Sequence, residues 1–175
     1  MNQSESLYCP KCKSDSFRKI SRKEYACPDC RFSFFFNVAA AGRALLTWRD
    51  EILFTVRKYE PGKDLLDLPG GFVDPQESAE SSIRREIREE IGLSVGTLSY
   101  FCSFPNRYPY KGITYDTLDL FFTAVLDDKP ALFPSDEVKA VVWIKRSEIN
   151  FEKLAFPSLN QALTLFLKKA SRDVS

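Results

Sequence analysis

The sequence predicts an α/β fold, in which helices cover both sides of a mixed sheet, preceded by a small segment rich in cysteine. Short apolar runs alternate with two stretches of helical periodicity, an order typical of mixed sheets covered by helices. Four of the five cysteines lie within the first 30 residues, in two Cys-x-x-Cys pairs. We therefore expect two domains, residues 1–36 and residues 37–175.

Six apolar runs predict the strands of the larger domain. The turn Arg49-Asp50 separates the first two runs, and Pro69-Gly70-Gly71 breaks the chain after the third. The predicted strands are 44–48, 52–56, 65–68, 95–104, 115–125 and 138–144. A helix is expected between the third and fourth strands, with Ser78 as its N-cap and Gly92 at its end.

The helix has an apolar stripe at every fourth position, which should face the sheet. These positions are Ala79, Ile83, Ile87 and Ile91. Glu86 and Glu90 border the stripe, so their carboxylates should stand at the edge of the buried face. A second amphipathic pattern over 159–167 predicts a closing helix.

Composition narrows the function classes. The 44% apolar content and fifteen Phe of this 175-residue chain can fill a substantial core. No apolar run approaches the roughly 20 residues of a membrane span, and no charged-then-apolar leader opens the chain, so we expect a cytoplasmic protein without membrane contact. The net charge of +1 argues against bulk attraction to nucleic acid. Histidine is absent, so a general base must be a carboxylate, Lys, Tyr or bound hydroxide.

The two Cys-x-x-Cys pairs predict a metal site. Cys9 and Cys12 are separated from Cys27 and Cys30 by the fourteen residues 13–26. This arrangement suits a structural Zn²⁺ bound by four thiolates. Two disulfides or four free thiols are the alternatives. Because so short a segment cannot hold a core unaided, the metal is expected to supply its folding energy.

Three glutamates gather on the predicted helix. Glu86, Glu89 and Glu90 share one face because they lie at i, i+3 and i+4. Like charges at this spacing repel each other, which favours a role for a hard divalent cation such as Mg²⁺ or Mn²⁺. A solvated acidic face is the alternative.

The segment around these glutamates, GFVDPQESAESSIRREIREEIGL from Gly71 to Leu93, resembles the 23-residue signature of the Nudix hydrolases at every position. The resemblance implies an α/β/α sandwich and metal-dependent hydrolysis of a pyrophosphate bond. The alternative is a catalytically silent Nudix domain that senses a nucleotide. In that case the N-terminal segment with the four cysteines, a zinc ribbon, would bind nucleic acid or a protein partner.

The resemblance also implies roles for particular residues. Glu86 and Glu90 match the chief metal ligands, and Glu89 supports them. The backbone carbonyl of Gly70 matches a further metal contact.

Three further residues complete the predicted catalytic set. Arg85 is expected to pair with Glu77, which would fix the loop against the helix. Glu137 matches a position where related enzymes carry an additional ligand or base, and an exposed loop charge is its alternative.

A zinc ribbon ahead of a Nudix domain resembles the NADH pyrophosphatases, whose motif SQPWPFPxS is half kept here over residues 103–111. The resemblance makes these residues candidates for substrate contact, with the tyrosines stacking on a base and the cations meeting phosphate: Ser103, Arg107, Tyr108, Tyr110 and Lys111. A proline-stiffened loop is the alternative. Phe35 matches an adenine-contacting position of these enzymes, and a place in a core is its alternative.

The resemblance suggests NAD(H) as the first substrate and ADP-ribose as the second, since Pro109 also fits the spacing of ADP-ribose pyrophosphatases. RNA bearing a 5′ NAD cap is an extension of the first choice. A homodimer is expected from the zinc-ribbon relatives.

Overall fold

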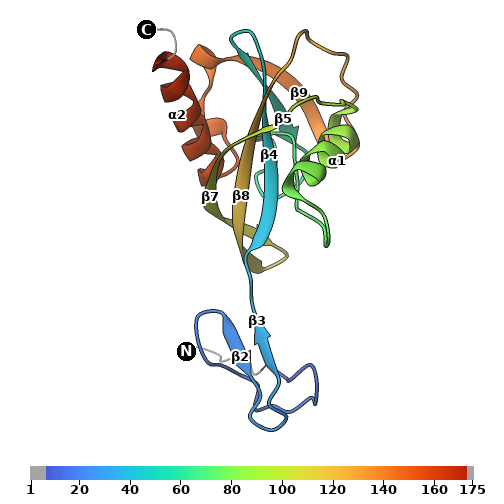
Figure 1. The fold of residues 1–175 in the computed structure, drawn as a ribbon, viewed down its shortest axis with the longest axis vertical. Helices are drawn as coiled ribbons and strands as arrows, with labels where there is room; N and C mark the ends of the chain where they lie inside the picture. Colours follow the sequence, from blue (N-terminus) through green and yellow to red (C-terminus); the bar gives the residue numbers. More distant parts are fainter. Residues whose placement is uncertain (1–6, 173–175) are drawn as a thin grey trace. The chain divides into compact units, whose positions relative to one another are not determined.

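The computed structural model describes residues 7–172, and the chain divides into two compact units, Met1–Val38 and Ala39–Ser175. Figure 1 shows the elements of both units along the chain. None of the helices in residues 7–172 is long and apolar enough to cross a membrane.

The N-terminal unit is built on a small antiparallel sheet. Its three strands follow one another in the order β1 (Arg18–Lys19), β2 (Glu24–Ala26) and β3 (Ser33–Phe35). The buried residues of this unit are Cys9, Phe17 and Cys27. So small a core agrees with the expectation that a bound metal helps to hold this unit together.

The C-terminal unit contains a mixed six-stranded sheet in the order β6-β5-β4-β8-β7, with β9 also paired to β5. Strands β4 and β8 run parallel, and the other pairs are antiparallel. The strands are β4 (Ala39–Trp48), β5 (Glu51–Arg57), β6 (Leu66–Asp67), β7 (Ser99–Tyr110), β8 (Ile113–Val125) and β9 (Val138–Lys145).

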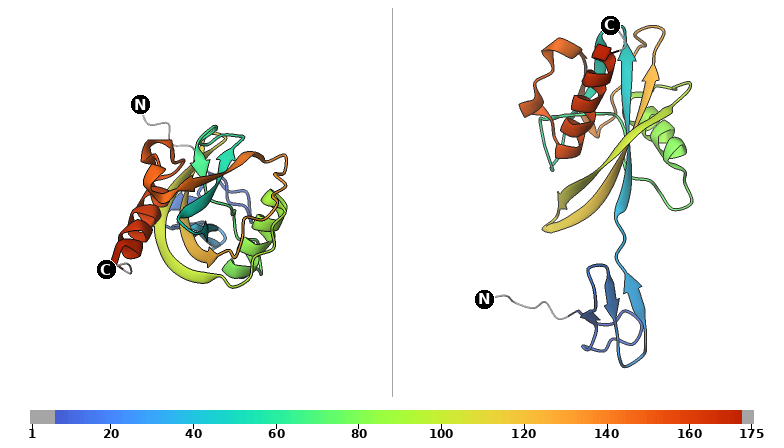
Figure 2. Two further views of the ribbon diagram at one scale, coloured as in Figure 1. Left: turned by 90° about the horizontal axis from the view of Figure 1, so that it is seen from above. Right: turned by 60° about the vertical axis from the view of Figure 1, so that its left-hand side comes forward.

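Helices α1 (Ala79–Ile91) and α2 (Pro157–Arg172) cover opposite faces of this sheet, as the views in Figures 1 and 2 agree. Two short 3₁₀ turns, η1 (Arg146–Glu148) and η2 (Phe151–Lys153), lead into α2. Neighbouring strand residues enter different cores, since Leu45 packs in the cluster with α2 and Leu46 in the cluster with α1. The predicted α/β architecture is therefore confirmed.

Helix α1 has the predicted limits. The Ser78 hydroxyl accepts a hydrogen bond from the Ser81 N–H at 3.2 Å, which caps the first turn. Gly92 ends the helix in the left-handed conformation, with φ of 70°, and its N–H donates to the Arg88 carbonyl at 3.0 Å. These local signals fix both ends, and three isoleucines of the predicted stripe are fully buried: Ile83, Ile87 and Ile91.

Strand β7 differs from the expected 95–104, because it begins at Ser99 and continues to Tyr110. The Arg84 guanidinium donates to the Val95 carbonyl at 2.5 Å, and this holds residues 93–98 against α1 instead of in the sheet. Lys111 and Gly112, with φ of 47° and 81°, form the two-residue turn into β8.

The interpretation of 103–111 as a proline-stiffened loop is therefore wrong. Pro105 and Pro109 are tolerated in β7 because it is an edge strand, where a missing N–H need not break a ladder.

Candidate functional site

A cavity of about 590 Å³ gathers residues that the sequence suggested separately. Its lining comes from β4, β5 and the segment that follows it, β6, the Gly-Gly turn with the loop after it, α1, the end of β7 and the start of β9. Six residues of the predicted site line it: Gly70, Glu86, Glu90, Tyr108, Tyr110 and Glu137. Glutamates from two distant segments therefore face a space that also has aromatic walls.

The two glutamates on α1 reach the cavity because of their position beside the apolar stripe. Ile83 and Ile87 are fully buried against the sheet, and Glu86 and Glu90 follow them by three residues each. Both carboxylates consequently stand at the edge of the buried face, as expected. Glu89 lies outside the cavity, with 59% of its side chain exposed.

Burial governs the electrostatics of this pair. Partial burial raises the pKa of Glu90 to about 8, although the Gly70 N–H and the nearby Arg43 charge act to lower it. The Gly70 N–H donates to Glu90 Oε2 at 3.0 Å. Burial also raises the pKa of Glu86. Near neutral pH the cavity therefore favours either a proton or a cation beside the Glu90 carboxylate.

Arg85 binds the acidic residues around the turn. Its guanidinium pairs with both carboxylate oxygens of Glu77, each at 3.0 Å, which is the pairing expected from the sequence. A further nitrogen, Nη1, lies 2.9 Å from Glu86 Oε1 and 3.0 Å from Glu89 Oε2. The Arg85 Nη2 also donates to the Phe72 carbonyl at 3.3 Å. These bonds hold the loop 72–78 against the helix.

The Gly-Gly turn allows the backbone to pass close to this cluster. A Cβ on Gly71 would lie 2.4 Å from Glu86 Oε1, so the space beside the carboxylate exists only with glycine there. A Cβ on Gly70, where φ is 140°, would lie 2.1 Å from the Gly42 carbonyl oxygen. Gly70 is thus required by the neighbouring backbone, whereas Gly71 leaves room for the Glu86 carboxylate at the cavity.

Glu137 joins the site from a different part of the chain. It is exposed at the cavity just before β9, and its N–H donates to the Ser135 hydroxyl at 3.3 Å. The Ser135 N–H in turn donates to the Glu90 carbonyl at 2.8 Å. The loop that carries Glu137 is therefore attached to the C-terminal end of α1.

Sequence reasoning missed a buried charge network in the wall of the cavity. Asp67 lies between two arginines, with Arg57 Nη1 at 2.8 Å and Arg43 Nε at 3.4 Å. Burial alone would lower the pKa of Arg43, but the charges of Asp67, Asp119 and Glu90 raise it. The sequence does contain one signal for this network, because Arg43 is the one charged residue in the apolar run 39–47.

Aromatic rings form another wall. Tyr108 packs edge-on against Phe72, with ring centroids 5.3 Å apart, and also contacts Phe156 at 5.8 Å. The Arg57 guanidinium donates to the Tyr108 hydroxyl at 3.4 Å. Tyr108 is thus held in place, whereas Tyr110 is more exposed beside it.

Besides Glu77, Arg85 and Glu89, four other predicted residues do not line this cavity: Phe35, Ser103, Arg107 and Lys111. Side chains alternate along β7, so Ser103 and Arg107 point to the face opposite Tyr108 and Tyr110. Lys111 lies in the hairpin turn, with its ammonium 5.1 Å from the centre of the Tyr110 ring. Arg43 and Arg57 line the cavity in their place.

Phe35 belongs to the N-terminal unit and is 49% exposed. Its neighbours Phe34 and Phe36 are exposed as well, so the interpretation of this run as core is wrong.

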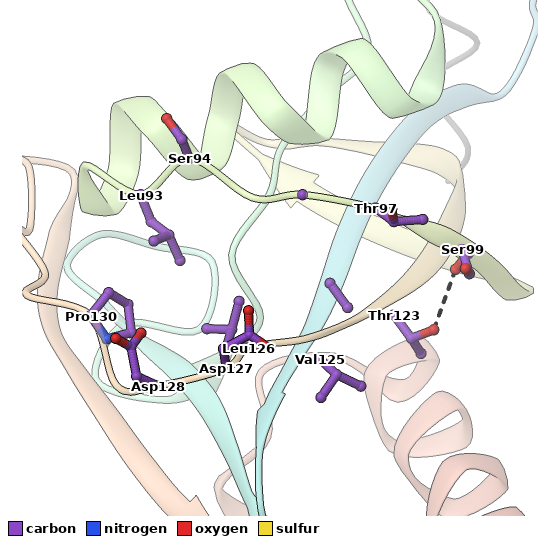
Figure 3. A pocket seen from close by; sticks show the side chains of 12 residues that line it. Leu93, Ser94, Thr97, Ser99, Thr123, Val125, Leu126, Asp127, Asp128 and Pro130 are labelled. Atoms are coloured by element: carbon purple, nitrogen blue, oxygen red, sulfur yellow. Dashed lines mark hydrogen bonds between the residues drawn. The ribbon is translucent and has the colours of Figure 1, made fainter.

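A second cavity, of about 560 Å³, lies between the segment after α1 and the end of β8 (Figure 3). The Thr123 hydroxyl donates to the Ser99 carbonyl at its edge, at 3.5 Å. Its lining includes Asp127 and Asp128 but no Lys or Arg. An anionic substrate therefore finds no countercharge there, which favours the first cavity.

The four cysteines of the N-terminal unit form a compact cluster that could hold a metal. Their sulfurs all lie within 4.8 Å of one another. The Cys9–Cys30 and Cys12–Cys27 sulfurs are 3.6 and 3.7 Å apart, which is too long for a disulfide. Zn–S bonds of about 2.3 Å in a tetrahedron would set neighbouring sulfurs roughly 3.8 Å apart, so the cluster fits such an ion.

Comparison with known proteins covers most of the chain. The sequence model of the NUDIX domain matches residues 36–165. The NAD-capped RNA hydrolase NudC of Stutzerimonas stutzeri is 27% identical over 109 residues, which are 62% of this chain and 39% of that protein. An ADP-ribose pyrophosphatase of Methanocaldococcus jannaschii is 36% identical over 81 residues, 45% of this chain and 48% of that protein. The chain thus spans less than half the length of either relative.

Among solved structures, a NUDIX hydrolase from Nitrosomonas europaea superimposes with a TM-score of 0.71 at 21% identity, covering 94% of this chain and 92% of that one. This likeness confirms the predicted fold. Because the family's sequence model also matches well over half of its residues, the chain belongs to the Nudix family.

Proposed function

We propose that the protein hydrolyses the pyrophosphate bond of a nucleoside diphosphate linked to another moiety. The observation that carries this proposal is the cavity in which Glu86, Glu90 and Glu137 face Arg43 and Arg57. The negative oxygens of a pyrophosphate screen its phosphorus atoms from an attacking water. Cations held by the carboxylates and guanidiniums that bind phosphate would both neutralise this charge.

The donor set fits a hard divalent cation. Carboxylate oxygens of Glu86 and Glu90 would hold it, with Glu137 and the Gly70 carbonyl as further oxygen ligands and Glu89 in support. Mg²⁺ or Mn²⁺ suits these oxygens, and either one neutralises phosphate charge and lowers the pKa of bound water.

The protein's own residues have separate tasks. Arg85 keeps Glu86 and the loop with Glu77 in position through its paired hydrogen bonds. Glu137, exposed at the cavity, can accept a proton from the attacking water. Arg43 and Arg57 attract the phosphates.

The substrate remains a choice among nucleotides. An NAD(H)-type dinucleotide is proposed first and ADP-ribose second, which the names of the two relatives support. Tyr59 and Tyr110, both exposed at the cavity, are the rings best able to stack on a base. RNA with a 5′ NAD cap is an extension of the first choice. Phe35, Ser103, Arg107 and Lys111 are not proposed as contacts, because none of them lines the cavity.

The test is a turnover screen of the full chain with Mg²⁺ or Mn²⁺ on NADH, ADP-ribose, FAD and nucleoside triphosphates, with products separated by chromatography. We expect a nucleoside monophosphate from a linked diphosphate, and its loss in Glu86→Gln. Glu80→Gln, in the first turn of the same helix, is the matched control. Tight nucleotide binding without turnover on any of these compounds would instead favour the silent sensor.

Zn²⁺ is proposed for the four-cysteine cluster, with residues 1–36 as a ribbon domain and 37–175 as the hydrolase domain. A homodimer is proposed as well, and light scattering on the purified chain tests it.

A further inference from the structure

One face of the small N-terminal sheet carries aromatic side chains that run from its core to the surface. The buried Phe17 contacts Tyr25, with ring centroids 5.7 Å apart, and Tyr25 contacts Phe36 at 5.1 Å. Phe36 then meets Phe34 edge-on at 4.9 Å. The last two rings are well exposed, 54% for Phe36 and 42% for Phe34.

The strand register places two lysines on this same face. Lys19, Tyr25 and Phe34 lie directly opposite one another across the three strands. The Phe36 N–H donates to the Lys23 carbonyl at 2.8 Å, which continues the pairing by one step. We call Lys19, Lys23, Tyr25, Phe34 and Phe36 the aromatic face.

Because side chains alternate along a strand, the residues between those of the aromatic face point the other way. Arg18 lies opposite Ala26 in that second row, and Phe35 lies opposite Glu24. The sheet therefore provides an exposed arginine and an exposed phenylalanine as matched controls on its opposite side.

The charge around the aromatic face is positive. Lys19 and Lys23 are exposed, and the face has no acidic residue. Residues 7–38 contain seven Lys or Arg, all exposed, against three acidic residues. One of these acids, Asp29, accepts a hydrogen bond from Ser14. A zinc ion bound by four thiolates, with a net charge of about −2, still leaves this segment positive.

We propose that the aromatic face binds single-stranded nucleic acid. Exposed rings provide surfaces on which unpaired bases stack regardless of sequence, and neighbouring lysines meet the phosphates between those bases. A duplex would keep its bases stacked on each other and away from the rings. The proposal goes beyond pyrophosphate hydrolysis and does not depend on it, since none of its residues lines the cavity of the C-terminal unit.

The experiment measures the fluorescence anisotropy of labelled oligouridylate and oligothymidylate without a 5′ cap, titrated with the zinc-loaded full chain over a series of salt concentrations. We expect both strands to bind. The double variant Phe34→Ala/Phe36→Ala should weaken binding by about tenfold or more, because two stacking surfaces are lost. Lys19→Gln/Lys23→Gln should lower the slope of log K against log salt by about 1.4, since each phosphate contact contributes roughly 0.7.

Phe35→Ala and Arg18→Gln, on the opposite side of the sheet, should leave affinity and salt slope unchanged. Zinc content checks that each variant keeps its fold. Absence of binding at low salt overturns the proposal, as does an equal loss in the control variants. A change from dimer to monomer in Phe34→Ala/Phe36→Ala without loss of strand binding also overturns it and assigns the face to a second copy of the chain.

Glu86→Gln should bind the oligonucleotides like the unmodified protein. Failure of hydrolysis and failure of strand binding are therefore distinguishable.

Discussion

At the scale of single residues, glycines decide how closely the backbone approaches the acidic cluster. A Cβ on Gly71 would meet the carboxylate end of Glu86 at 2.4 Å, and a Cβ on Gly42 would meet Ile83 Cγ1 at 2.3 Å. The first neighbour is the flexible end of a side chain at the cavity, whereas the second is fully buried in the core. The two positions should therefore respond to alanine in opposite ways.

Gly71→Ala should keep the fold but lose most of the hydrolytic activity, because Glu86 must swing away from the cavity. Gly42→Ala should instead destabilise the protein by about 1–3 kcal/mol through overpacking against α1. Urea unfolding and turnover, measured on both variants, check the pair. A Gly71→Ala protein with full activity would contradict the role given to Glu86.

The buried charge network makes a second prediction at this scale. Asp67→Ala would leave Arg43 and Arg57 without their shared carboxylate, and an uncompensated buried charge costs about 3–5 kcal/mol. Asp64→Ala removes a partner of Lys139 that is half exposed, so its cost should stay within about 1 kcal/mol. Urea unfolding of both variants measures the two losses of unfolding free energy. Similar losses in Asp67→Ala and Asp64→Ala would show that the buried charge network does not stabilise this wall of the cavity.

Single residues also show where sequence reasoning ends. Glu86 and Glu90 are predictable because they share one face of a helix, and Glu77 is predictable because it holds a position of the Nudix signature. The partnership of Arg43 with Asp67 joins two strands that are not neighbours in sequence, so no local pattern reveals it. Arg107 was expected at the site from motif position alone, but strand alternation turns it to the other face of β7.

At the scale of elements, α1 was predictable and β7 was not. Helix ends depend on capping groups within a few residues, and Ser78 and Gly92 supply them. The start of β7 depends on a long-range bond, since Arg84 holds the Val95 carbonyl away from the sheet. Its end depends on a turn of Lys111 and Gly112 that allows positive φ.

The end of α1 is itself testable. Gly92 has φ of 70°, and a Cβ there would approach Phe133 at 3.2 Å, in the loop that leads to Glu137. Gly92→Ala should therefore cost about 1 kcal/mol of stability. Gly96→Ala, where a Cβ meets nothing within 4 Å, should be nearly neutral. Thermal unfolding distinguishes the two, and equal shifts would argue against a strained helix end.

At the scale of the whole molecule, the two units rely on different sources of stability. The C-terminal unit has two hydrophobic clusters, one on each face of its sheet. Within residues 7–38, the N-terminal unit buries only Phe17 and two cysteines, Cys9 and Cys27, which belong to its four-cysteine cluster. Burial in a segment this small cannot offset the entropy of ordering its backbone, so we expect a metal bound by the cysteine cluster to contribute to its folding.

Loss of one cysteine ligand should therefore affect one unit only. Cys9→Ser should lose bound zinc and the ordered structure of residues 7–38, while the C-terminal unit keeps its unfolding midpoint because its two cores are unchanged. Cys102→Ser, which alters the one cysteine outside the cluster, should keep one zinc per chain. Elemental analysis gives the zinc content, and amide NMR spectra show which unit loses dispersion. A Cys9→Ser protein with full zinc and an unchanged spectrum would show that the cluster is not the metal site, because three thiolates and a serine hydroxyl bind Zn²⁺ far less well than four thiolates.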